Sequence, residues 1–120
     1  MFTLSSTHKF QLYTTPTDMR KSFDGLSGLV QELLGKSPTH SSVFIFINKR
    51  RDKIKLLHWV GSGFILYYKR LEEGTFELPR YEIDQGSIQL NYTQMVMLVD
   101  GISIVNIHRR KRYSSSVKTE

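Results

Sequence analysis

The chain has 120 residues, enough for one compact domain, and 39% of them are hydrophobic, which is ordinary for a globular core and argues against global disorder. Seventeen Lys and Arg against eleven Asp and Glu give a formal net charge of +6. This excess favours an anionic partner, most often nucleic acid and less often a membrane surface or an acidic protein.

The main helix is predicted over about residues 18–34, after a short strand within Lys9–Thr14. Its evidence is a run of apolar residues, from Met19 to Leu34, that recur at helical spacing. Either Thr17 or Asp18 is the expected N-cap, and Gly35 the expected C-terminal cap. Asp24 follows Arg20 by four residues, which predicts an ion pair on the helix surface and leaves Lys21 free to contact a partner.

Three runs rich in β-branched and aromatic residues predict an antiparallel meander at residues 43–48, 54–60 and 64–71. Residues 76–78 and 88–90 predict further short strands, and residues 92–100 a short second helix. The expected fold is therefore α+β, a three- to five-stranded antiparallel meander sheet with the main helix packed on one face. Residues 1–107 are expected to form this single domain and residues 108–120 a basic, mobile tail.

A hairpin that pairs Ile47 with Ile54 divides the predicted sheet into two faces, because side chains alternate along a strand. One face is aliphatic and is the expected partner of the main helix: Val43, Ile45, Ile47, Ile54, Leu56 and Val60. The other is aromatic and basic: Phe44, Phe46, Lys55, Leu57 and Trp59, with either Tyr67 and Lys69 or Tyr68 and Arg70, depending on the turn at Gly61–Gly63.

Aromatic rings among cations are typical of proteins that bind single-stranded nucleic acid. The candidate aromatic contacts are Phe44, Phe46, Trp59, Tyr67 and Tyr68. Apolar sheet faces are more often buried, however. We therefore favour a second face that is covered by the N-terminal strand, the C-terminal helix or a second protomer.

Basic residues gather at the hairpin tip, on the strands beside it and in the tail. These are the candidate nucleic-acid contacts: Lys49, Arg50, Arg51, Lys53, Lys55, Lys69, Arg70, Arg109, Arg110, Lys111 and Arg112. A projecting basic hairpin with a basic tail suits contacts to DNA or RNA phosphates, with affinity that falls steeply as salt rises. A solvated turn that only keeps the hairpin soluble fits the pattern equally well.

Catalysis has little support in the sequence. Cysteine is absent, the four histidines lie in separate segments, and no phosphate-binding loop or serine nucleophile motif is present, so we expect neither a metal nor a cofactor. A metal-dependent nuclease built on Asp18, Asp24, Asp52 or Glu72 is a remote alternative, because no two of these acids have the spacing of two-metal chemistry. No apolar run approaches the ~20 residues of a transmembrane helix and no secretory signal is visible, so we expect a cytoplasmic protein.

Two blocks carry a family resemblance: "PTDMRKSFDGLSGLV" and "VFIFINKRRDKIKLLHWVGSGFILYYKRLEEGTFELP". They resemble the TnpB-type accessory protein of the sixty-six family of bacterial insertion sequences, which is unrelated to the RNA-guided nuclease of the same name. The resemblance is close over Leu12–Pro79 and weaker through "IQLNYTQMVMLVDGI". It marks Asp18, Arg20, Lys21 and Asp24 as signature positions. The chain departs from the family at Val60, where an acidic residue is usual, and at Ser22, where glycine is common.

The resemblance implies a small accessory protein that is encoded beside a much larger transposase and assists transposition. The transposase carries the acidic catalytic triad, and no catalytic residue is carried over to this chain. We therefore expect a non-enzymatic factor that binds the DNA of insertion-sequence ends, the transposase, or both. The alternative is a protein interaction or homodimerisation module without direct DNA contact.

Overall fold

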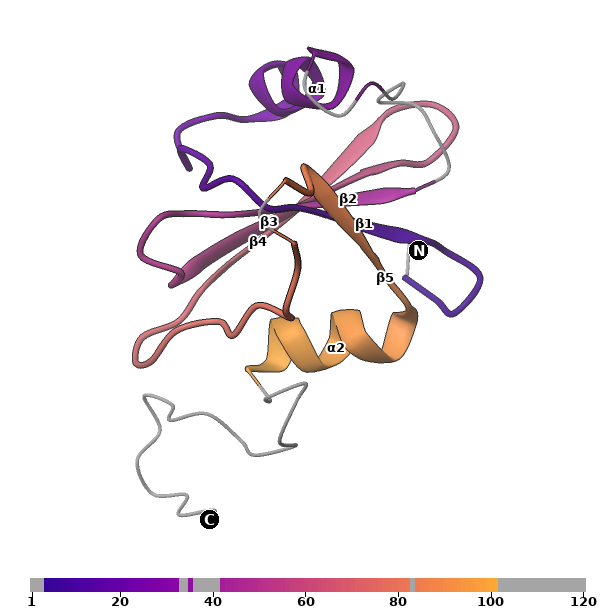
Figure 1. Ribbon diagram of the computed structural model, residues 1–120. Coiled ribbons are helices and arrows are strands. Elements are labelled where there is room, and N and C mark those ends of the chain that lie inside the picture. The colour runs from indigo at the N-terminus through magenta and orange to yellow at the C-terminus, as the bar shows by residue number, and fades with distance from the viewer. Residues whose placement is uncertain (1–3, 33–34, 36–41, 83, 102–120) are drawn as a thin grey trace.

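The computed structural model describes residues 4–32, 35, 42–82 and 84–101, which form a five-stranded sheet with one helix on each face (Figure 1). In chain order the elements are β1 (Phe10–Tyr13), α1 (Phe23–Glu32), β2 (Val43–Ile47), β3 (Lys53–Trp59), β4 (Phe64–Arg70), β5 (Ser87–Leu90) and α2 (Tyr92–Asp100). The strands lie in the order β4-β3-β2-β1-β5. The predicted α+β fold is confirmed, and the tail at residues 108–120 lies outside the described residues. Neither α1 nor α2 has the length and apolar composition of a membrane-spanning helix.

The direction of β1 differs from the prediction. β2, β3 and β4 form the expected antiparallel meander, with Ile47 opposite Ile54. β1 pairs with β5 in antiparallel fashion but with β2 in parallel, Phe10 lying opposite Val43. The prediction of a wholly antiparallel sheet is therefore wrong for the β1–β2 pair and correct for the other strand pairs. The chain crosses through α1 between β1 and β2, and such a crossover is the usual connection between parallel neighbours.

The smaller predicted elements are mostly present. Residues 88–90 lie in β5, and α2 has a capping box in which the Asn91 side chain accepts a hydrogen bond from the N–H of Gln94. Gly101 ends α2 with a left-handed φ of 81°. Residues 76–78 form no strand. Phe76 is instead fully buried, and its N–H donates to the carbonyl of Arg51 at 2.6 Å.

The two helices cover opposite faces of the sheet, and α1 lies on the aromatic face (Figure 1). Under α1 is one buried cluster: Tyr13, Leu26, Val30, Phe44, Phe46 and Leu57. The aliphatic set, apart from Val60 beyond the end of β3, packs with residues of α2: Val43, Ile45, Ile47, Ile54, Leu56, Met95 and Leu98. The predicted pairing of the main helix with the aliphatic face is wrong. Both faces are apolar, so alternation shows which residues share a face but not which helix covers it.

The second face is covered, as expected from the sequence, but α1 covers it rather than the N-terminal strand or the C-terminal helix. Phe44 and Phe46 have no exposed surface in this fold. The β3–β4 register places Lys55 opposite Tyr68 and Lys53 opposite Arg70. Tyr68 and Arg70 therefore share the α1 face, and Tyr67 and Lys69 share the α2 face.

α1 begins later than predicted, at Phe23. The preceding residues, 16–22, form a segment that we call the signature loop, and neither Thr17 nor Asp18 is an N-cap. The Thr17 N–H donates to the carbonyl of Ile47 at 2.9 Å, which attaches this loop to the end of β2. The helical spacing of apolar residues extends into the signature loop. In the loop, however, the Thr17 N–H bonds to the sheet, and α1 does not begin until Phe23.

Lys55 fixes the signature loop to β3. Its Nζ donates to the carbonyl oxygens of Met19 and Lys21, both at 2.8 Å, and the residue is only 5% exposed. A buried ammonium is costly unless hydrogen bonds replace its lost hydration, and these two carbonyls supply them. Lys55 therefore has a structural role, and its predicted role as a nucleic-acid contact does not fit this geometry.

Replacing Lys55 with methionine is expected to release the signature loop. The substitution removes both hydrogen bonds from the Lys55 ammonium to the loop, and we expect the free energy of local opening to fall by about 1.4 kcal/mol or more. Tryptic cleavage after Arg20 and Lys21 should then accelerate about tenfold or more. Mass spectrometry of timed digests would measure it, with cleavage at the hairpin tip as the internal reference. Lys9→Met, at an exposed position, is the matched control. Unchanged cleavage in Lys55→Met would contradict this role.

Truncating Phe46 tests whether the aromatic face is core. Phe46→Ala should lower the free energy of unfolding by about 3–5 kcal/mol, since it removes a fully buried ring beneath α1. Phe23→Ala removes a ring that is 43% exposed and should cost far less. Urea denaturation followed by circular dichroism would compare the two. Equal losses would show that the aromatic face is not the better-packed site.

Candidate nucleic-acid interface

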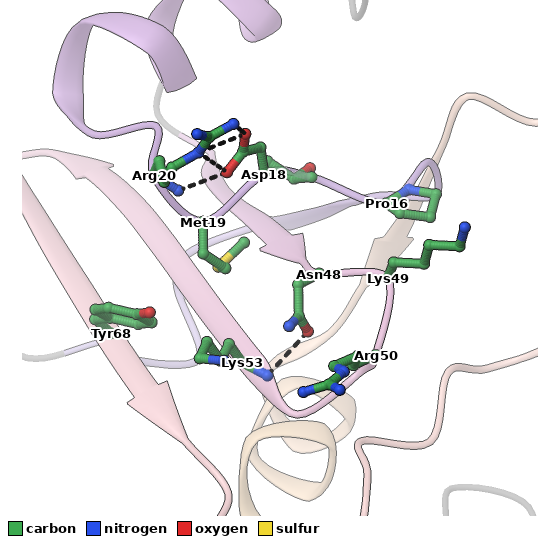
Figure 2. A pocket seen from close by; sticks show the side chains of 10 residues that line it. Pro16, Asp18, Met19, Arg20, Asn48, Lys49, Arg50, Lys53 and Tyr68 are labelled. Atoms are coloured by element: carbon green, nitrogen blue, oxygen red, sulfur yellow. Dashed lines mark hydrogen bonds and ion pairs between the residues drawn. The ribbon is translucent and has the colours of Figure 1, made fainter.

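A groove separates the signature loop from the tip of the β2–β3 hairpin. It is open to solvent and has a volume of about 630 Å³. Figure 2 shows the residues that line it: Pro16, Thr17, Asp18, Met19, Arg20, Asn48, Lys49, Arg50, Lys53 and Tyr68. We call it the hairpin groove. Because β1 and β2 are parallel, their carboxyl ends lie at the same edge of the sheet, and the segments that follow them meet there.

The hairpin tip is held by the side chain of Asn48. Its Oδ1 accepts hydrogen bonds from the N–H groups of Asp52 and Lys53, both at 3.0 Å, and its Nδ2 donates to the Asp52 carboxylate at 2.7 Å. This last bond lowers the pKa of Asp52 despite partial burial. The loop is thus ordered by polar bonds at its base, and Lys49 and Arg50 are left exposed at its tip.

Across the groove, Asp18 and Arg20 form a close ion pair. The Arg20 Nη2 lies 2.7 Å from the Asp18 Oδ2, and the Arg20 N–H also donates to Oδ1 at 2.9 Å (Figure 2). The side-chain bond from Arg20 lowers the pKa of Asp18 to about 2. The predicted pairing of Arg20 with Asp24 is wrong, because Arg20 lies in the loop rather than on α1. Asp24 is exposed in the first turn of α1, where a carboxylate favours the helix N-terminus.

Among the described residues, only part of the predicted basic set lines the hairpin groove. Lys49, Arg50 and Lys53 line the hairpin groove, although Lys53 also lies 3.9 Å from Asp52. Arg51 has a φ of 61° and lines a small separate cavity with Tyr13, Leu78 and Tyr81 among its walls. Arg109, Arg110, Lys111 and Arg112 lie outside the described residues.

Two further cations are engaged elsewhere. The Nζ of Lys69 donates to the carbonyl of Val99 at 2.8 Å, at the negative end of α2. The guanidinium of Arg70 meets the Glu72 carboxylate at 2.7 Å, and this pair is largely exposed. Neither residue lines the hairpin groove.

Tyr68 is the one candidate aromatic residue that lines the hairpin groove. It is 54% exposed, and the Lys55 Nζ lies 4.6 Å from the centre of its ring. Trp59 instead packs edge-on against Phe64 at a centroid distance of 5.0 Å. Tyr67 is on the α2 face, where its hydroxyl is buried.

The hairpin groove itself was not predicted from the sequence. Its two walls were recognised as separate features, a helix start and a basic turn. The parallel pairing of β1 and β2 brings the two walls together. It was not predicted, because the residue pattern of two short strands does not specify their relative direction. Among the described residues, no three acidic or histidine side chains gather in a way that could hold a metal ion.

Comparison with known proteins shows the family of this chain. Residues 8–109 match the family described as "IS66 Orf2 like protein". Two similar proteins come from Sinorhizobium fredii (strain NBRC 101917 / NGR234). "Uncharacterized protein y4jC" is 31% identical over 102 residues, 85% of this chain and 86% of the relative. "Uncharacterized protein y4hO" is 35% identical over 89 residues, 74% of this chain and 76% of the relative. No solved structure matches. The chain therefore belongs to the IS66 Orf2-like family, the accessory proteins of these bacterial insertion sequences.

Proposed function

We propose that this chain is a non-catalytic accessory protein of transposition that binds DNA through the hairpin groove. The observation that carries the proposal is the exposure of Lys49 and Arg50 beside an open groove. Within the described residues, neither side chain forms an ion pair with a carboxylate, although the charge of Arg50 contributes to the lowered pKa of Asp52. Both side chains are exposed and can be reached by a phosphate. Cations that are already bonded to the protein's own backbone, such as Lys55 and Lys69, would offer far less.

The arrangement of these cations suits a phosphate backbone. Lys49, Arg50 and Lys53 come from the hairpin wall, and Arg20 lies on the facing wall. Asp18 is the one carboxylate among the described residues that line the groove, and it forms an ion pair with Arg20. The net charge of +6 for the whole chain acts in the same direction, since it raises the local concentration of a polyanion.

Removing the two cations of the hairpin tip should weaken DNA binding and its dependence on salt. For a Lys49→Ala/Arg50→Ala double variant, we expect the slope of log affinity against log salt to become shallower by about 1.8, the value for two lost phosphate contacts on duplex DNA. Fluorescence anisotropy with DNA from the element ends, between 50 and 300 mM NaCl, would measure it. The stability of the fold should be unchanged, because both positions are exposed.

Lys9→Ala is the matched control. Lys9 is exposed at the start of β1, beside the start of β2, and therefore at the opposite end of the sheet from the hairpin tip. The Lys9→Ala substitution removes one positive charge and leaves the residues of the groove unchanged. An equal loss in the control would show that net charge rather than the groove binds DNA. Absence of binding at 50 mM NaCl, or binding insensitive to salt, would overturn the proposal.

Contact with the large transposase can be separated from contact with DNA. If the groove acts through DNA, co-purification of the two proteins should depend on element-end DNA and disappear after nuclease treatment. Co-purification that survives nuclease and is lost in Lys49→Ala/Arg50→Ala would assign the groove to the transposase instead.

A further inference from the structure

We propose that the hairpin groove binds single-stranded DNA, with one unpaired base stacked on the ring of Tyr68 and the adjoining phosphates held by Lys49 and Arg50. This inference rests on the proposed function and specifies the form of DNA that the groove accepts. Three features carry it: the exposure of Tyr68, the way its ring is held, and the position of the ring in the same groove as Lys49 and Arg50.

Tyr68 is the most exposed aromatic residue that the strands place on the α1 face. Phe44, Phe46 and Leu57 on this face are fully buried, and Trp59, Phe64 and Leu66 are partly buried, whereas Tyr68 is 54% exposed. It is also more exposed than the other large apolar side chains that reach the surface of the described structure: Phe23, Tyr81, Tyr92 and Val96. α1 and the signature loop cover the rest of the face and leave this ring open to the groove.

The ring is also held in place. The Lys55 Nζ lies 4.6 Å from the ring centre, and two carbonyl bonds at 2.8 Å fix that ammonium in turn. A cation against one side of a tyrosine ring is an attractive contact, and it restrains the ring against the sheet. A platform restrained in this way loses little conformational freedom when a second planar group stacks on it.

An aromatic platform in a groove selects unpaired bases. Within a duplex each base is already stacked on its neighbours, so its flat surface is hidden, whereas a single strand exposes that surface. Tyr68 lines the same groove as Lys49 and Arg50 from one wall and Arg20 from the other. A single strand that lies along this open groove places one base on the ring and its adjoining phosphates among the cations of the hairpin wall.

Binding of a labelled 12-nucleotide oligo-dT and of a 12-base-pair dA·dT duplex at 50 mM NaCl tests this. We expect wild-type protein to bind the single strand more tightly. Tyr68→Leu should weaken single-strand binding about 5- to 150-fold, the range for loss of one base–aromatic stack, and change duplex binding less than twofold. Tyr68→Phe keeps the ring and should bind like wild type. Lys49→Ala/Arg50→Ala should weaken both forms.

A crosslinking measurement needs no variant. An oligo-dT with one 5-iodouracil, irradiated in complex with the wild-type chain, should crosslink to the peptide that contains Tyr68. If the duplex binds as tightly as the single strand and Tyr68→Leu affects neither, the inference is wrong, while a loss in Lys49→Ala/Arg50→Ala still supports the proposed function. If neither form of DNA binds, both proposals fail. A crosslink confined to another peptide would also overturn the role of Tyr68.

Discussion

The parallel pairing of β1 with β2 is the constraint on which the rest of the structure depends. It sets the two strands in the same direction, so the segments that leave their carboxyl ends emerge at one edge of the sheet. One of these segments is the signature loop and the other is the β2–β3 hairpin. With β1 reversed, the two would lie at opposite ends of the sheet and no groove would form between them. The same crossover carries α1 over the aromatic face and thereby buries Phe44 and Phe46.

Lys55 turns this proximity into a defined shape. In the sequence, Lys55 cannot be told apart from the other basic residues of the hairpin, because the chain is rich in Lys and Arg. In the structure its ammonium instead donates hydrogen bonds to two backbone carbonyls and contacts the ring of Tyr68. The signature block and the hairpin block of the family are therefore joined by a direct bond.

Much of the fold could be predicted from the sequence. Alternation and turn residues were sufficient for the meander and the pairing of Ile47 with Ile54, and Gly101 correctly ended α2. Strand direction and the face covered by α1 were not predictable, because both sheet faces are apolar. The predicted start of α1 was wrong for a different reason. The Thr17 N–H donates to the carbonyl of Ile47, and this tertiary contact overrides a local pattern that is helical. Of the predicted contacts, charge alone could not distinguish Lys55, which is buried, from Arg50, which is exposed.

The side chain of Asn48 has a consequence for which substitutions this hairpin can accept. It bonds to Asp52 and to the backbone of Lys53, so the conformation of the hairpin is determined at its base. The side chains of Lys49 and Arg50 contribute charge but no bond that holds the turn in the described structure. Substitutions at these two positions can therefore raise or lower the positive charge of the groove at little cost to folding. The charge of the groove and the conformation of the hairpin are therefore set by different residues of the same turn.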